Sequence, residues 1–137
     1  MVQIRIYRLP DLSSVISLWE KCGLVVPQND PQTDIEKKLQ FQPDLFLVAE
    51  KNGRIAGTVM AGYEGHRGWI NYLAVDPDIQ RQGVGRKLME HAEKRLKALG
   101  CLKINLQVRT GNEAVIAFYE QLGYSVDPVV SMGKRMK

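Results

Sequence analysis

A polar, glycine-bearing segment in the second half of the chain has the residue types that bind an anion. The segment consists of Gln80, Arg81, Gln82, Gly83, Val84, Gly85 and Arg86, and it leads into an expected helix. The first N–H groups of a helix have no intrahelical partner, and the helix dipole places partial positive charge there. Glycine lets a phosphate approach the backbone, and arginine adds charged, forked donors. The segment is therefore expected to cradle a phosphate group.

Two standard nucleotide-binding motifs do not fit this segment. The chain contains no GxxxxGK[ST] string, so a P-loop is excluded. A dinucleotide fingerprint would need a third glycine where Leu88 stands, and it normally follows the first strand of a parallel sheet. Taken alone, the segment could also be a glycine-rich turn that merely starts a helix.

Two motifs together resemble the GNAT family of acyl-CoA-dependent N-acetyltransferases. The family's pyrophosphate loop, [QR]-x-x-G-x-[GA], is matched by Gln80, Gly83 and Gly85, and the family's frequent Leu-Ala-Val precedes it as Leu73, Ala74 and Val75. A second family pattern is matched closely by Asn112, Phe118, Tyr119, Gly123 and Tyr124. Both motifs stand in the family's order, and the likeness covers nearly the whole chain in element order.

The resemblance implies a fold and a cofactor. The fold is α+β: a mixed, mostly antiparallel sheet with one splayed parallel strand pair, flanked by about four helices. The co-substrate is acetyl-CoA, with its pyrophosphate on the backbone of residues 82–86 and its pantetheine arm along Leu73, Ala74 and Val75. Asn112 resembles the residue that contacts this arm. A backbone N–H near Leu73 would polarise the thioester carbonyl.

The resemblance also implies direct attack of an amine on the thioester. Tyr119 matches the family's general acid by position; the alternative is a packed aromatic residue of the last helix. Trp69 stands where many members carry a glutamate base, and tryptophan cannot accept a proton. Glu64 is therefore the candidate base, with His66 beside it. Alternatively, Asn71 or Tyr72 could order a water.

The surrounding pattern supplies the elements that must position these residues. Strands are expected at 4–6, 45–50, 55–63, 69–75 and 103–108, with a type I′ turn at 52–53. Helices are expected over 12–22 behind Asp11, 31–41 behind Asp30, 85–99 before Gly100, and 113–122. A final pair of short strands is expected at 124–126 and 130–134. The strand–helix–strand unit from 69 to 108 predicts one parallel pair.

Composition indicates the general class of the protein and the kinds of site it can contain. The 137 residues are 45% hydrophobic and 25% charged, which predicts one globular domain over residues 1–137. Apolar runs are too short for a membrane span, and the first residues lack a signal core, so a cytoplasmic protein is expected. Two cysteines and two histidines without ligand spacing argue against a metal site. The net charge of +4 mildly favours anionic partners.

Several alternatives stay open from sequence. The acceptor could be a protein N-terminus, a lysine or a small amine, and the acids that could favour a cation are Glu20, Asp30, Asp34 and Glu64. A module that senses acyl-CoA without turning it over is the main alternative to an enzyme. Nucleic-acid binding through the basic residues of 81–97 is disfavoured, because no aromatic-interleaved basic stripe is visible. The late strands could pair with a second copy.

Overall fold

The computed structural model describes residues 1–79 and 81–136. Contacts within the chain group it into two compact units, Met1–Gln107 and Val108–Lys137, and each is described by itself. The expected single domain spans both units and stays a prediction. Within the described residues, no helix is both long and apolar enough to cross a membrane.

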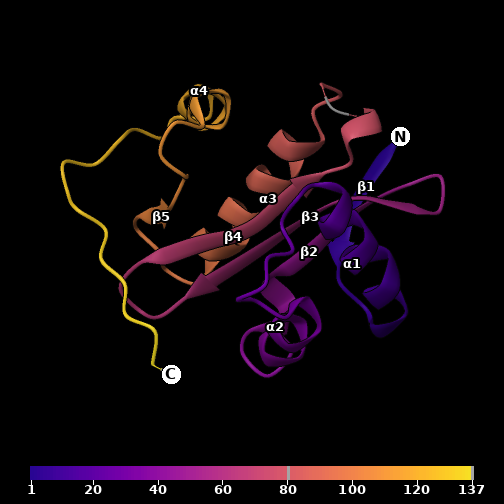
Figure 1. The fold of residues 1–137 in the computed structure, drawn as a ribbon. Helices are drawn as coiled ribbons and strands as arrows, with labels where there is room; N and C mark the ends of the chain where they lie inside the picture. The colour runs from indigo at the N-terminus through magenta and orange to yellow at the C-terminus, as the bar shows by residue number, and fades with distance from the viewer. Residues whose placement is uncertain (80, 137) are drawn as a thin grey trace. The chain divides into compact units, whose positions relative to one another are not determined.

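The first unit is built on a five-stranded mixed sheet, as expected (Figure 1). Its strands lie in chain order: β1 (Val2–Ile6), β2 (Phe46–Lys51), β3 (Arg54–Tyr63), β4 (Gly68–Val75) and β5 (Ile104–Leu106). The first three pairings are antiparallel, and β4 with β5 is parallel. The type I′ turn between β2 and β3 is confirmed, because Asn52 and Gly53 have φ of 53° and 76°.

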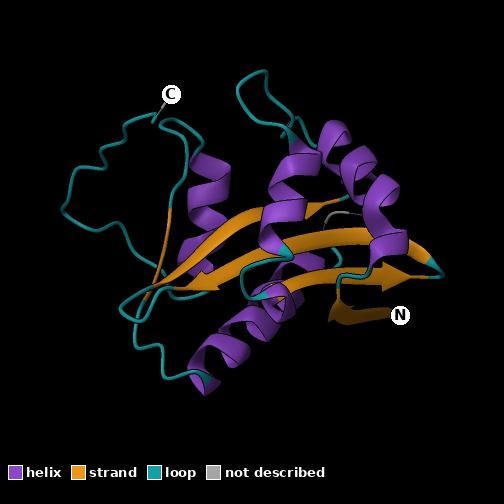
Figure 2. Ribbon diagram, turned by 90° about the horizontal axis from the view of Figure 1, so that it is seen from below, coloured by secondary structure: helices purple, strands orange, loops and turns teal. Residues whose placement is uncertain are grey.

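Helices cover both faces of this sheet (Figure 2). One face carries α1 (Leu12–Lys21) and α2 (Pro31–Lys38), and the other carries α3 (Val84–Ala98). Single 3₁₀ turns lie at Leu9–Asp11, Pro43–Leu45 and Pro77–Ile79. The strand alternation explains the two layers, since successive side chains of β2 point to opposite faces and are all buried from Phe46 to Ala49.

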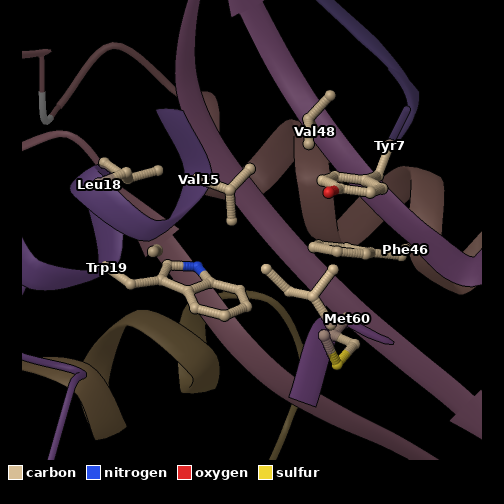
Figure 3. Close-up of a cluster of buried hydrophobic side chains, with 9 residues drawn as sticks. Tyr7, Val15, Leu18, Trp19, Phe46, Val48 and Met60 are labelled. Atoms are coloured by element: carbon tan, nitrogen blue, oxygen red, sulfur yellow. The ribbon is translucent and has the colours of Figure 1, made fainter. Parts of the chain in front are cut away.

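The core on the α1 face is aromatic (Figure 3). Tyr7 stacks on Phe46 with ring centroids 4.6 Å apart, and Trp19 lies 6.2 Å from the same ring. Val15 and Val48 fill the space beside them and are fully buried. Burial of each large side chain contributes about 1.5–3 kcal/mol, so this cluster fixes α1 on the sheet.

Two predicted helix caps have different outcomes. The Asp30 side chain accepts from Gln32 N at 3.2 Å and caps α2, as predicted. Asp11 does not cap α1 with its side chain. Its carboxylate instead receives two bonds from the Arg5 guanidinium, at 2.8 and 2.9 Å, because an ionised fork is a stronger partner than a helix amide.

The end of β3 that extends past β2 is closed by side chains from the last residue of α2 and the loop after it. The Tyr63 N–H donates to Gln42 Oε1 at 2.8 Å, and Gln42 Nε2 donates to the Tyr63 carbonyl at 2.9 Å. Lys38 Nζ donates to the Ala61 carbonyl nearby. Half-buried next to this strand, Lys38 has a lowered pKa, because desolvation disfavours its charged form.

The second unit contains α4 (Glu113–Gln121), as predicted. The expected strands at 124–126 and 130–134 are wrong: the described residues after α4 form no strand. Val126, Val130 and Met132 are between 76% and 91% exposed, so the segment lacks the buried face that stabilises a strand. The strand expected at 103–108 is confirmed but shorter, at Ile104–Leu106.

Candidate active site

The start of α3 presents unpaired backbone donors. Gly83 is the N-cap, with φ of 78°, and the first helical bond runs from Lys87 N to the Gly83 carbonyl at 3.0 Å. The N–H groups of Val84, Gly85 and Arg86 therefore precede the helical ladder. The helix dipole adds partial positive charge at the same place, so this turn can hold an anion.

The loop before α3 brings in charged and polar side chains. Arg81 has a left-handed backbone, with φ of 69°, and both Arg81 and Arg86 are exposed. Gln82 is tied to the end of β2, because Lys51 Nζ donates to its Oε1 at 2.6 Å. Gln80, which was predicted to bind the cofactor, lies outside the described residues.

A close approach at Gly57 sets the position of α3 on the sheet. A Cβ added to Gly57 would lie 2.8 Å from the Ala74 carbonyl oxygen, 2.9 Å from Leu88 Cδ1 and 3.1 Å from Val84 Cγ1. Only glycine lets β3 and the first turns of α3 meet at this spacing. The first turns of α3, which carry these donors, are thus packed against β3 and β4 near Ala74.

Strand β4 carries a bulge at Tyr72 and Leu73. From Asn71 to Ala74 the strand advances three residues, whereas its partner advances only two, from Met60 to Thr58. Tyr72 has a left-handed backbone with φ of 52°, which is uncommon for a bulky residue. The bulge re-aims the backbone just before Ala74 and Val75.

The end of β4 also lacks a neighbour on its second side. β5 pairs with β4 only at Gly68, Trp69 and Ile70, while β4 continues to Val75. Within the described part of the chain, no strand pairs with residues 71–75 on that side. This is the splay expected of the parallel pair, and it leaves a strand edge that an extended, amide-bearing ligand can add to.

The predicted pantetheine-binding residues differ in what they already contact. Ala74 is buried and pairs with Thr58, and Val75 pairs with Gly57. The Val75 carbonyl also accepts a 3.4 Å bond from Cys22 Sγ. Burial raises the pKa of this thiol, so Cys22 is neutral at physiological pH.

The predicted acid and the predicted pantetheine contact lie in the second unit. Asn112 caps α4, with its Oδ1 accepting from Val115 N at 3.4 Å. Tyr119 is 9% exposed and forms edge contacts with Phe118 and Tyr124. Burial raises the pKa of Tyr119 to about 12, so its hydroxyl keeps its proton at neutral pH and can donate.

The predicted base, Glu64, is engaged within its own turn. Its Oε1 accepts from the backbone N–H of His66 and, at 3.1 Å, from that of Arg67. These two hydrogen bonds lower the pKa of Glu64, which weakens its affinity for a proton. Trp69 lies in β4 and is 37% exposed.

Of the four acids that could favour a cationic acceptor, one contacts the bulge. Asp34, on α2, accepts from the Tyr72 hydroxyl at 2.6 Å. Asp30 is used as the α2 cap, and Glu20 is an exposed residue of α1. The Tyr72 ring also stacks on Trp19, with centroids 3.9 Å apart. The pKa of Tyr72 is raised, first by burial and then by the Asp34 bond.

Sequence reasoning missed the residues that hold the bulge. Thr58 is fully buried in a strand of small and apolar residues, and it contacts both Trp19 and Tyr72. A hydroxyl at an inward position of such a strand is the signal that could have identified it, because a buried polar group needs partners. Among the described residues, no group of three potential metal-ligating side chains is found.

Comparisons with known proteins agree with this geometry. Residues 12–124 match the family model described as the acetyltransferase (GNAT) family. A protein of Pectobacterium atrosepticum described as an acetyltransferase is 52% identical over 98% of this chain and 96% of its own length. A similar protein of Sodalis glossinidius is 51% identical over the same shares. The chain therefore belongs to the GNAT acetyltransferase family.

Solved structures of the family have the same fold. The ribosomal-protein-S18-alanine N-acetyltransferase of Escherichia coli has a TM-score of 0.76 and 29% identity, covering 90% of this chain and 77% of that one. Naa20 of Chaetomium thermophilum, solved with a bisubstrate analogue, has a TM-score of 0.74 and 30% identity, covering 90% and 71%. The mixed sheet with one splayed parallel pair is thus the family's fold.

Proposed function

We propose that this protein transfers the acetyl group of acetyl-CoA to a primary amine by direct attack. One observation carries the proposal: the open, bulged end of β4 and the unpaired N–H groups at the start of α3 lie close together in the chain, since β4 ends at Val75 and the N-cap of α3 is Gly83. The first suits an extended chain with amide groups, and the second suits a diphosphate. Coenzyme A contains both in one molecule.

The residue roles follow from that arrangement. Backbone groups of Leu73, Ala74 and Val75 would pair with the pantetheine arm. The N–H groups of residues 82–86 would hold the pyrophosphate, with Arg81 and Arg86 adding charge. Asn112 would contact the pantetheine arm or its neighbouring loop. The Leu73 N–H would donate to the thioester oxygen as negative charge develops there.

The reaction itself needs two proton transfers. A neutral amine adds to the carbonyl carbon, the carbon–sulfur bond breaks, and the CoA thiolate leaves. Tyr119, which holds its proton at neutral pH, would donate to that sulfur. The attacking amine must lose a proton first, because an alkyl amine with a pKa of about 10.4 is only about 0.04% neutral at pH 7.

The proton of the attacking amine could leave by either of two routes. Glu64 is the titratable candidate, but its lowered pKa makes it a weak base. A water ordered by Asn71 or by Tyr72 could carry the proton to solvent instead. The second route is compatible with the Tyr72–Asp34 contact at the bulge.

The acceptor is a primary amine, for which three chemical classes are considered. The two solved relatives near 30% identity include an enzyme named for acetylating the alanine of ribosomal protein S18. A peptide N-terminal amine is therefore the first acceptor to test here. Lysine side chains and small amines are the next two classes.

The test separates an enzyme from a module that only senses acyl-CoA. Calorimetry with acetyl-CoA and CoA measures binding, and thiol release against a panel of peptides, lysine derivatives and small amines measures turnover. Binding with turnover supports the proposal. Binding without turnover on every amine class favours the sensing module, and absence of both overturns the proposal. Nucleic-acid binding that persists at saturating CoA would favour a third function.

A further inference from the structure

A buried hydrogen-bond relay holds the bulged peptide of β4. Trp19 Nε1 donates to Thr58 Oγ1 at 2.9 Å, and Thr58 Oγ1 donates to the Tyr72 carbonyl at 2.8 Å. Trp19 and Thr58 are both fully buried. The indole can only donate and the carbonyl can only accept, so the Thr58 hydroxyl proton must point to the Tyr72 carbonyl.

This direction fixes where the next amide points. The chain has no cis peptide bonds among its described residues, and in a trans peptide the C=O and the N–H lie on opposite sides. The Tyr72 carbonyl is directed to the Thr58 hydroxyl, which lies against Trp19 of α1, so the Leu73 N–H of the same peptide is directed away from that hydroxyl. Leu73 lies in the stretch of β4 that β5 leaves unpaired, since the described pairing with β5 ends at Ile70.

The relay also offsets a strained backbone. A left-handed conformation is strained for a non-glycine residue and persists only where its surroundings require it. Tyr72 is held at its carbonyl by Thr58, at its ring by stacking on Trp19, and at its hydroxyl by Asp34. Trp19 thus acts twice, once through Thr58 and once through the ring.

We propose that Thr58, oriented by Trp19, is a positioning residue that aims the Leu73 N–H at the thioester carbonyl. This inference rests on the proposed acetyl transfer. Thr58 acts through the bulged peptide, because its hydroxyl donates to the Tyr72 carbonyl and not to the substrate. A purely structural threonine would support folding but would leave the polarisation of a bound thioester unchanged.

The test uses two pairs of variants that differ only in the hydroxyl. Thr58→Val keeps the shape of the wild-type side chain, and Thr58→Ser and Thr58→Ala form a second pair at smaller volume. Each is compared for acetyl-CoA affinity, kcat, and the infrared carbonyl stretch of bound acetyl-CoA carrying a ¹³C-labelled thioester carbon. A hydrogen bond to that carbonyl lowers its stretching frequency.

The hydroxyl-free variants are expected to lose at least about tenfold in kcat, in line with the loss of one oxyanion donor. Their affinity for acetyl-CoA should change by less than about threefold, and the carbonyl stretch should move back toward its value in solution. Thr58→Ser should keep the wild-type stretch and most of kcat. Folded Val and Ala variants with the wild-type stretch and kcat would overturn the inference.

If the Val and Ala variants do not fold, Thr58→Cys serves instead, because a thiol is only a weak donor to the Tyr72 carbonyl; an unchanged stretch and kcat then overturn the inference. If wild-type protein does not bind acetyl-CoA, the proposed function fails, which is a different result from a failed relay.

Discussion

Gly57 and Ala74 approach each other so closely that a Cβ on Gly57 would lie 2.8 Å from the Ala74 carbonyl oxygen. Gly57→Ala is therefore expected to lower the free energy of unfolding by about 1–3 kcal/mol, since a backbone atom cannot move aside cheaply. Denaturant titration measures the change. Gly62→Ala, in the same strand, has its nearest contacts at 3.8 Å and is the matched control. Equal stability of the two variants would contradict the close approach.

The charged loop gives a prediction about cofactor affinity. Arg81→Ala and Arg86→Ala are each expected to weaken CoA binding about 10-fold, because each removes a charge-assisted donor near the start of α3. Lys97→Ala, exposed in the last turn of the same helix, removes an equal charge far from the loop. Calorimetry compares the three. A uniform loss of affinity would indicate general electrostatic attraction instead of a localised site.

Tyr119→Phe tests the general acid. Removal of the Tyr119 hydroxyl is expected to lower kcat about 100-fold while leaving the affinity for acetyl-CoA unchanged. The pKa of Tyr119 is raised to about 12, and an acid must be protonated to act, so no fall in rate from Tyr119 should appear below about pH 11. Tyr124→Phe, whose ring lies 5.7 Å from that of Tyr119, controls for packing. Unchanged turnover in Tyr119→Phe removes the role.

Glu64→Gln tests the base through the pH–rate profile. Two backbone hydrogen bonds hold the pKa of Glu64 below its usual range, so this carboxylate is ionised throughout neutral and alkaline pH. Deprotonation of the acceptor amine should then set the rise in rate with pH, and the midpoint should not move in Glu64→Gln. A shifted midpoint would restore Glu64 as the base.

Acid stability depends on the ion pair between Arg5 and Asp11. The Arg5 hydrogen bonds hold the pKa of Asp11 below its unfolded value of about 3.8. The resulting stabilisation is present above that value and is lost as the pH falls through the folded pKa. Asp11→Asn should cost about 1–3 kcal/mol at pH 7 and flatten the loss of stability below pH 4. Asp44→Asn, at an exposed carboxylate, should do neither.

Much of the fold could be predicted because its signals are local. The positive φ needed at Asn52 and Gly53, the Asp30 cap, and the period of residues 88–99 each act within a few residues. The strands at 124–126 and 130–134 were predicted wrongly, since alternation alone cannot say whether a buried face exists. The Asp11 cap failed because its partner, Arg5, lies on another element.

The candidate site likewise has one part that depends on local sequence and one part that depends on long-range contacts. The glycine-containing loop is contiguous, so its residues could be identified from their order. The bulge at Tyr72 depends on pairing between β3 and β4, and its support comes from Thr58 and Trp19, far away in the chain. Contacts over such separations leave no pattern in a single sequence, except for one polar residue at an inward strand position.

Gln42 occupies both main-chain groups of Tyr63, at 2.8 and 2.9 Å. An exposed strand edge ordinarily offers a template on which another polypeptide can extend the sheet. Here the side-chain amide of Gln42, from the same molecule, already pairs with these main-chain groups. Extension of the sheet by an added strand is thereby blocked at Tyr63, in the end of β3 that continues past its pairing with β2.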